Sequence, residues 1–135
     1  MIFFDLLAVV PLIGAAIRDQ KTKTISDAHI IAIFICAVAK AVGTDYSALE
    51  LITGGVLVGT VFGVWGVATD AFGGGDVKMA TVLGCLYGWR KAMGVMMLAL
   101  LLGCLICRRE RKGALAPFVL TSDLIFIIGG LIRYV

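Results

Sequence analysis

Two acidic residues stand in short loops beside long apolar stretches. Asp19 lies in "RDQKTKTIS" (residues 18–26), directly after the first apolar stretch, and Asp76 lies in "GGGDVK" (residues 73–78), directly before another. If the two meet, one carboxylate can take a proton from water while the other, protonated, donates to a carbonyl oxygen, which is the chemistry of aspartic peptidases. The alternative is that these acids only mark the loops between helices.

The composition decides which solvent surrounds the apolar stretches. The chain has 135 residues, of which 61% are hydrophobic and 16% charged, with a mean hydropathy of +1.05. Soluble domains are about 45–50% apolar and about 25% charged, and so short a chain cannot bury this much apolar surface. We therefore predict an all-α integral membrane protein in which residues 1–135 form one membrane-embedded domain.

Apolar stretches bounded by charges or turn residues predict about six transmembrane helices. They cover residues 2–17, 28–43, 48–69, 77–89, 92–107 and 113–132. The fourth and fifth stretches could form one helix, but this would place Arg90 and Lys91 inside the membrane at about 2.5–3.5 kcal/mol each. A tight hairpin at "GWRK" (residues 88–91) avoids that cost. The first stretch lacks a basic start and a cleavage site, so we expect a retained helix.

The basic residues predict the orientation. Six alternating spans place the loops 18–27, 70–76 and 108–112 on one face, with both termini on the other. The first face carries Arg18, Lys21, Lys23, Lys78, Arg108, Arg109, Arg111 and Lys112, and the second carries Lys40, Arg90, Lys91 and Arg133. This excess favours the first face as cytoplasmic, so Asp19 and Asp76 are expected at the cytoplasmic surface of a cell membrane. The net charge of +3 follows from these loops, which favours lipid headgroups as the partner of the basic residues and not nucleic acid.

The glycines before Asp76 suggest an unusual backbone. Gly73, Gly74 and Gly75 permit positive φ and close backbone approach, which would let this loop bend back into the protein and accept a substrate strand. A simple flexible connector is the alternative. At the start of a helix the ionised form of Asp76 is favoured, with Lys78 adding to the effect, so we expect Asp76 to be the more readily ionised of the two aspartates.

Two further aspartates are candidates for a functional role. Asp123 lies inside the apolar run "FVLTSDLIFII", where an ionisable group is a functional candidate; it would line a cavity or pair with another helix. Asp70 could be the true partner of the catalytic pair, or it could end the third helix at the headgroups.

The small residues and the cysteines are predicted to have structural roles and no part in the chemistry. Glycines recur at four-residue spacing in two stretches, at Gly55, Gly59, Gly63, Gly84 and Gly88, which predicts close helix packing. Cys104 and Cys107 form a CxxC without a second pair at metal-binding spacing, and His29 cannot build a metal site unaided. We expect neither a metal nor a cofactor.

Three segments carry a resemblance to a known family. "GGGDVK" resembles the GxGD signature of intramembrane aspartyl proteases, followed by the Val-Lys pair of type IV prepilin peptidases. "RDQKTKTIS" is similar to that family's first motif, an Asp followed six residues later by Ile-Pro-Asn, although Ser26 and Asp27 replace the Pro and Asn and leave the loop's shape open. "GALAPFVLTS" (residues 113–122) resembles the Pro-Phe segment that opens the last helix.

The resemblance implies a GxGD aspartyl protease-like fold and a membrane endopeptidase that removes the short leader of prepilins or pilin-like proteins, for type IV pili or protein secretion. Asp19 and Asp76 would be the catalytic pair, with Gly73, Gly75 and Lys78 supporting the loop or the substrate. Larger family members carry a domain with paired CxxC motifs and also methylate the new N-terminus. That insert is missing here, so we expect peptidase activity without methyl transfer.

Two other functions remain open. Asp19, Asp76 and Asp123 could bind ions or relay protons in a small transporter or channel subunit. The chain could also be a structural component of a secretion machine with degenerate acids. Loss of cleavage on mutating the aspartates would separate a peptidase from both. The filament system and the oligomeric state stay open.

Overall fold

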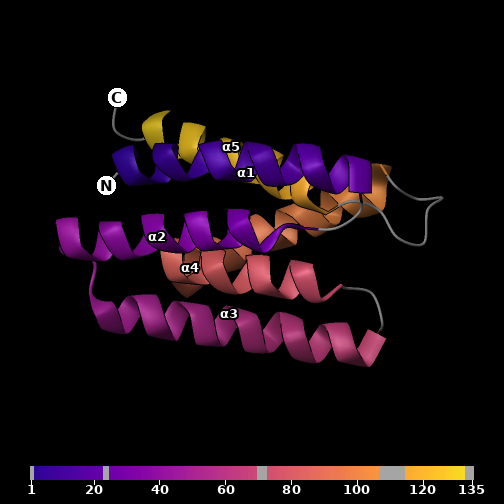
Figure 1. Cartoon of the computed structure of the whole chain (residues 1–135), viewed down its shortest axis with the longest axis horizontal. Helices are drawn as coiled ribbons and strands as arrows, with labels where there is room; N and C mark the ends of the chain where they lie inside the picture. Colours follow the sequence, from indigo (N-terminus) through magenta and orange to yellow (C-terminus); the bar gives the residue numbers. More distant parts are fainter. Residues whose placement is uncertain (1, 23–24, 70–72, 107–114, 133–135) are drawn as a thin grey trace.

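The chain is a bundle of helices in the computed structural model (Figure 1), which describes residues 2–22, 25–69, 73–106 and 115–132. The helices are α1 (Ile2–Thr22), α2 (Asp27–Gly43), α3 (Ala48–Thr69), α4 (Gly74–Ile106) and α5 (Ala116–Ile132). No strand occurs within the described ranges. The all-helical class predicted from the sequence is confirmed.

Helix α4 consists of two segments that fold back on each other at Gly88. This residue has φ 75° and ψ 165°, a conformation that is essentially restricted to glycine. Just after the break, Lys91 lies beside Asp5 near the start of α1. Further on, Gly103 lies beside Phe118 near the start of α5, at the opposite end of the bundle. The chain therefore reverses at the first residue of the predicted hairpin "GWRK".

With α4 divided at Gly88, the helical segments alternate in direction along the bundle. Figure 1 shows both termini at one end and the ends of α1, α3 and α4 at the other. Residues of alternate loops are thereby brought to the same end, as the spacing of the apolar stretches predicts. The number of membrane crossings itself stays a prediction.

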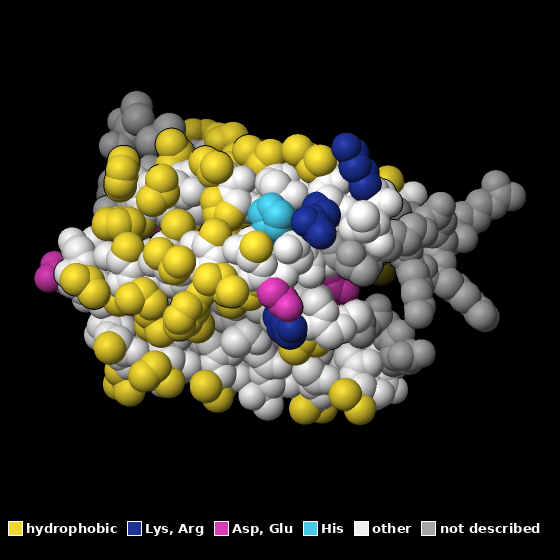
Figure 2. All heavy atoms as spheres, in the orientation of Figure 1, with side chains coloured by type: hydrophobic (Ala, Val, Ile, Leu, Met, Phe, Trp, Pro, Cys, Tyr) yellow, Lys and Arg dark blue, Asp and Glu magenta, His cyan; other side chains and the backbone are white. Residues whose placement is uncertain are grey.

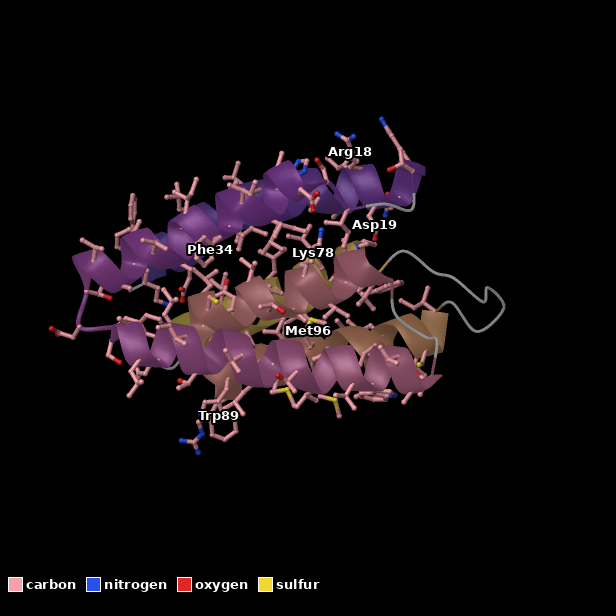
Figure 3. The ribbon with its side chains drawn as sticks, turned by 60° about the horizontal axis from the view of Figure 1, so that its bottom comes forward. Arg18, Asp19, Phe34, Lys78, Trp89 and Met96 are labelled. Carbon is pink, nitrogen blue, oxygen red and sulfur yellow. The ribbon has the colours of Figure 1, made fainter. Side chains whose placement is uncertain are left out.

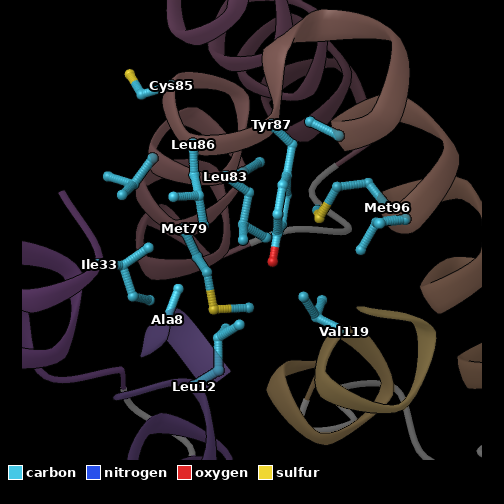
Figure 4. Close-up of a cluster of buried hydrophobic side chains, with 14 of the residues drawn as sticks. Ala8, Leu12, Ile33, Met79, Leu83, Cys85, Leu86, Tyr87, Met96 and Val119 are labelled. Carbon is cyan, nitrogen blue, oxygen red and sulfur yellow. The ribbon is translucent and has the colours of Figure 1, made fainter. Parts of the chain in front are cut away.

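The core surrounds the first segment of α4. Met79, Leu83 and Leu86 are fully buried, in one cluster with Leu12 from α1 and Val119 from α5 (Figure 4). Between helices in lipid, association is stabilised mainly by van der Waals packing, so interdigitation of these side chains fixes the position of the segment. The same segment carries Asp76 in its first turn.

Helix α3 packs against α4 through small residues. A Cβ atom added to Gly54 or to Gly84 would overlap the backbone of the other helix, and one added to Gly59 would overlap Thr81. The predicted packing role is confirmed for Gly55, Gly59 and Gly84. Gly88 also lies against α3, since a Cβ on Gly54 would be 3.0 Å from the Gly88 Cα, but its own Cβ would meet only Tyr46 Oη at 3.5 Å. What requires glycine at position 88 is therefore the reversal of the chain.

The outer surface of the bundle is largely apolar. Val10, Ile35, Val67 and Leu105 are among many large hydrophobic side chains that are exposed, and Figure 2 shows such side chains over much of one face. Within the described residues, α3 and α4 are long and apolar enough to cross a membrane, yet only 28% and 22% of their most apolar windows are buried inside the protein. The core helix of a soluble protein would be mostly buried, so lipid is the environment that this surface fits.

Candidate active site

Asp19 lies near the end of α1 and is almost fully buried, with 4% of its surface exposed. Its Oδ2 accepts a hydrogen bond of 3.0 Å from the backbone N–H of Ala116, the first residue of α5. This N–H is one of the donors that the start of a helix leaves without a partner in its own helix. The carboxylate on α1 thus satisfies the start of α5, and the N–H orients the carboxylate.

Asp76 lies in the first turn of α4, at the same end of the bundle. Its Oδ2 accepts a hydrogen bond of 3.2 Å from the N–H of Gly73, and its own N–H donates to the Gly73 carbonyl at 3.0 Å. These two bonds close the turn through which the chain enters α4. Figure 3 shows Asp19 and Lys78 towards this end and Trp89 towards the other. We call the end with Asp19, Asp76 and the 73–76 turn the Asp19 end.

The two carboxylates are close enough for their charges to interact. Asp76 precedes the predicted membrane-spanning stretch 77–89, and burial raises the pKa of its carboxyl from 3.8 to about 6. The hydrogen bond from Gly73 lowers this pKa, whereas the charge of Asp19 raises it further. A carboxyl with a pKa near 6 can hold a proton close to neutral pH, as the acid member of an acid–base pair must.

Lys78 forms an ion pair with Asp27 and not with Asp76. Its Nζ lies 2.9 Å from Oδ1 of Asp27, at the start of α2, and both side chains are largely exposed. An exposed ion pair of this kind contributes little stability, but it links α4 to α2 beside the site. The expected stabilisation of ionised Asp76 is outweighed, because desolvation raises the pKa of its carboxyl despite the hydrogen bond from Gly73 and because the Lys78 ammonium faces Asp27.

The glycine run is used differently from the prediction. Helix α4 begins at Gly74, and Gly88 is the one described glycine with positive φ, so Gly73, Gly74 and Gly75 do not adopt that conformation. Close approach is required at Gly75 alone, where a Cβ atom would lie 3.3 Å from Cβ of Ile25. The glycines therefore let the start of α4 lie against the loop that follows Asp19.

Ser26, which stands in place of the family's proline, has a backbone conformation that proline could also adopt. Ser26 has φ −74° and ψ 133°, an extended conformation that proline also adopts. Its carbonyl accepts the N–H of His29 at 3.1 Å and begins α2. The replacement of the family's proline by Ser26 therefore leaves this residue in a φ that proline allows.

Asp123 belongs to a second group of charges, near the end of the bundle opposite Asp19. Its Oδ2 accepts a hydrogen bond of 3.0 Å from the Tyr87 hydroxyl, and its buried Oδ1 has no partner among the described residues. Lys40 Nζ lies 2.7 Å from Asp5 Oδ1, and Lys91 Nζ lies 3.1 Å from Asp5 Oδ2. We call these five residues the Lys40 end; of the two predicted roles of Asp123, pairing with another helix fits this contact.

Lys40 and Tyr46 also satisfy the backbone at the break in α4. The Lys40 ammonium donates to the Leu86 carbonyl at 3.0 Å, and the Tyr46 hydroxyl donates to the Cys85 carbonyl at 3.0 Å. Because α4 is interrupted at Gly88, carbonyls in its preceding turn lose their helical partners. Sequence reasoning missed Asp5 and Lys40 as interacting residues, although a charge inside an apolar stretch is a signal for such a pair.

Asp70, which could replace Asp76 in the pair, lies outside the described residues, as does Cys107 of the CxxC motif. Within the described part, no group of three or more His, Cys, Asp or Glu residues is placed to hold a metal ion. The site that the structure assembles from the predicted residues is therefore the pair Asp19 and Asp76 with the glycine turn beside it.

The comparison with protein families bears directly on this pair. A model described as the type IV leader peptidase family matches residues 6–108. The chain belongs to the type IV leader peptidase family. Both Asp19 and Asp76 lie within the matched range, whereas Ala116 and Asp123 lie beyond it. The search of curated proteins and the search of solved structures each found no significant match.

Membership of a leader peptidase family agrees with the helical architecture and with the apolar exterior. The chain is thus a membrane protein of a protease family, and the family predicted from "GGGDVK" is confirmed. The identity of the catalytic residues is a separate question, which the geometry of the Asp19 end addresses.

Proposed function

We propose that this member of the type IV leader peptidase family is an aspartic endopeptidase that removes the N-terminal leader of prepilins or pilin-like proteins at the cytoplasmic surface of the membrane. The observation that carries this proposal is the meeting of Asp19 and Asp76 at one end of the bundle, where the charge of Asp19 raises the pKa of Asp76. A carboxyl whose pKa is raised by burial and by a second carboxylate nearby is the arrangement that an aspartic dyad requires.

The chemistry needs only water and the two carboxyl groups. The ionised carboxylate takes a proton from water as the water oxygen bonds to the scissile carbonyl carbon, and the protonated carboxyl gives its proton to the carbonyl oxygen. The resulting gem-diol collapses when its C–N bond breaks, the leaving nitrogen takes a proton from one aspartic acid, and a diol hydroxyl returns a proton to the other carboxylate. The dyad then holds one proton again.

The surroundings of the pair suit a peptide substrate that approaches from the membrane surface. Asp76 is partly exposed, and the Gly73–Gly75 run adds no side chain that would cover it. The excess of Lys and Arg in the loops at this end supports a cytoplasmic location by the positive-inside rule. We propose that Gly73 and Gly75 shape the entry to the dyad and that Lys78 holds α4 against α2.

The test is leader removal by the purified protein in detergent, followed by mass spectrometry of a prepilin-like substrate. Asp19→Asn and Asp76→Asn should each lower kcat by at least about 10²–10⁴-fold, and the double variant should be no worse than either single one because the pair acts as a unit. Asp45→Asn, an exposed aspartate at the far end, is the matched control and should cleave normally.

Two outcomes would contradict the proposal. Cleavage by Asp76→Asn together with loss in Asp70→Asn would show that the pair is a different one. Normal cleavage by both site variants, or proton flux in vesicles that these variants abolish while no leader is removed by the wild type, would favour the transporter alternative.

A further inference from the structure

The two carboxylates of the dyad lie in different surroundings, and the difference assigns their roles. We propose that the backbone N–H of Ala116, at the start of α5, holds Asp19 as the ionised base of the pair, so that Asp76 acts as the acid. This inference rests on the proposed function and goes beyond it, since a dyad can in principle operate with either assignment.

The first observation is the contact between Asp19 and α5. The bond from Ala116 N to Asp19 Oδ2 measures 3.0 Å and is buried, and a hydrogen bond from a backbone N–H to a carboxylate is stronger when the acceptor is ionised. In the same turn, the N–H of Phe118 donates to the Leu115 carbonyl at 3.0 Å and Pro117 has no N–H to offer. The Ala116 N–H is therefore the donor of this turn directed at Asp19.

The direction of α5 strengthens this preference. The start of an α-helix carries a partial positive charge, which stabilises an anion placed against it. Asp19 lies at the start of α5, a helix of 17 residues, and contacts its first N–H. Negative charge on Asp19 is thus stabilised by the helix start although the side chain is almost fully buried.

Asp76 is placed to hold the proton. Its Oδ2 accepts a longer bond from Gly73, in an exposed turn, and burial raises the pKa of its carboxyl to about 6. A protonated carboxyl can keep Oδ2 as the acceptor for Gly73 and carry its proton on Oδ1. With Lys78 paired to Asp27, no described cation forms an ion pair with Asp76 that would favour its ionised form.

The assignment fixes the path of each proton. Asp19 takes the proton from the attacking water, and Asp76 gives its proton to the carbonyl oxygen. On collapse of the gem-diol, Asp19 passes its proton to the leaving nitrogen, and Asp76 regains a proton from a diol hydroxyl. Ala116 itself touches neither water nor substrate; it is a positioning group that acts through Asp19.

The decisive variant removes the Ala116 N–H and leaves the side chains unchanged. Incorporation of the α-hydroxy analogue of alanine at position 116 replaces the amide by an ester. The matched control is the ester at Phe118, which removes a donor of the same helix turn that bonds Leu115 and not Asp19. Both proteins are assayed for leader cleavage in detergent, and their thermal unfolding is followed in parallel.

We expect the ester at 116 to lower kcat roughly 10- to 100-fold, as for loss of a hydrogen bond to a charged group, with KM little changed. The ester at 118 should lower the unfolding temperature and leave kcat close to wild type. Equal kcat in the two esters would overturn the inference, and the aspartate variants above would still decide whether the dyad is catalytic.

A second measurement reads the protonation states in the unaltered protein. With ¹³C-labelled aspartate in the wild type, the carboxyl signals of the two residues are assigned from their loss in Asp19→Asn and Asp76→Asn. In the form of the dyad that holds one proton, we expect Asp19 to give the signal of a carboxylate and Asp76 that of a carboxylic acid, and the Asp76 signal to change near pH 6. The reverse order would overturn the assignment even if both aspartates prove essential.

Discussion

Each end of the bundle holds two aspartates that are at least partly buried, but their surroundings differ. At the Lys40 end, Asp5 and Asp123 are accompanied by two ammonium groups and a phenol, with both oxygens of Asp5 in ion pairs. At the Asp19 end, within the described residues, Asp19 and Asp76 accept backbone N–H groups and form no ion pair. The carboxylates at the Lys40 end therefore have charged or phenolic partners from other helices, whereas those at the Asp19 end have backbone partners only in the part of the chain that the structure describes.

The difference predicts which end of the bundle contributes to the stability of the fold and which contributes to peptide cleavage. A buried carboxylate between two ammonium groups ties helices together, and removing one of its partners disturbs a buried ion pair. Asp19 and Asp76 have no ion-pair partner among the described residues, so their side chains contribute less to holding the helices together. We therefore expect substitutions at the Lys40 end to change unfolding, and substitutions at the Asp19 end to change cleavage.

The largest effect on activity should distinguish Asp19 from Asp123, although both carboxylates are buried. Asp19→Asn should lose cleavage, whereas Asp123→Asn should retain kcat within about threefold, less than 1 kcal/mol in activation free energy. The amide at position 123 can still accept the Tyr87 hydrogen bond. Steady-state cleavage at 25 °C on folded protein measures both, and equal loss in the two variants would remove the functional contrast between the ends.

The largest effect on stability should come from Lys40→Met. This side chain is 2% exposed and bonds both Asp5 and the Leu86 carbonyl. Because Lys91 still faces Asp5, we expect a loss of about 3 kcal/mol, the low end for breaking a buried ion pair. Thermal unfolding in detergent measures it. Lys91→Met, which removes the more exposed of the two partners of Asp5, should be less destabilised than Lys40→Met; an equal or larger loss in Lys91→Met would show that the buried Lys40 pair is not what stabilises this end.

The pH dependence of cleavage tests which protonation state of Asp76 is the active one. Burial raises the pKa of Asp76 to about 6, and the protonated form is the one that donates to the substrate. The contribution of Asp76 to kcat/KM is therefore complete below this pKa and is lost as the pH rises through it, by up to about tenfold per unit. A pH profile of kcat/KM checks this. A profile that rises through pH 6 and stays level above it would show that the ionised form of Asp76 is required.

The sequence predicts much of this comparison but not its details. Alternation of apolar stretches places Asp19 and Asp76 at one end, and the cost of burying Arg90 and Lys91 predicts the reversal near Gly88. The partners of Asp5 and Lys40 depend on how each helix is rotated about its axis, which uniformly apolar stretches leave open. The bond from Ala116 to Asp19 comes from a backbone group, which any residue but proline carries, so no residue type signals it.

The smallest predicted effect concerns the reversal that separates the two segments of α4. Gly88 has φ 75° and ψ 165°, which a residue with a Cβ adopts at a cost of about 1–3 kcal/mol. Because ψ lies far from the left-handed helical value, Gly88→Asn should cost as much as Gly88→Ala. The matched control is Gly63→Ala, where a Cβ would lie 3.6 Å from Val77 Cγ1 in ordinary contact; alanine in this helical position should be neutral or stabilising. Thermal unfolding compares the three variants. If Gly88→Asn proved as stable as wild type, the reversal would not depend on glycine, and the carbonyl bonds of Lys40 and Tyr46 would have to hold it alone.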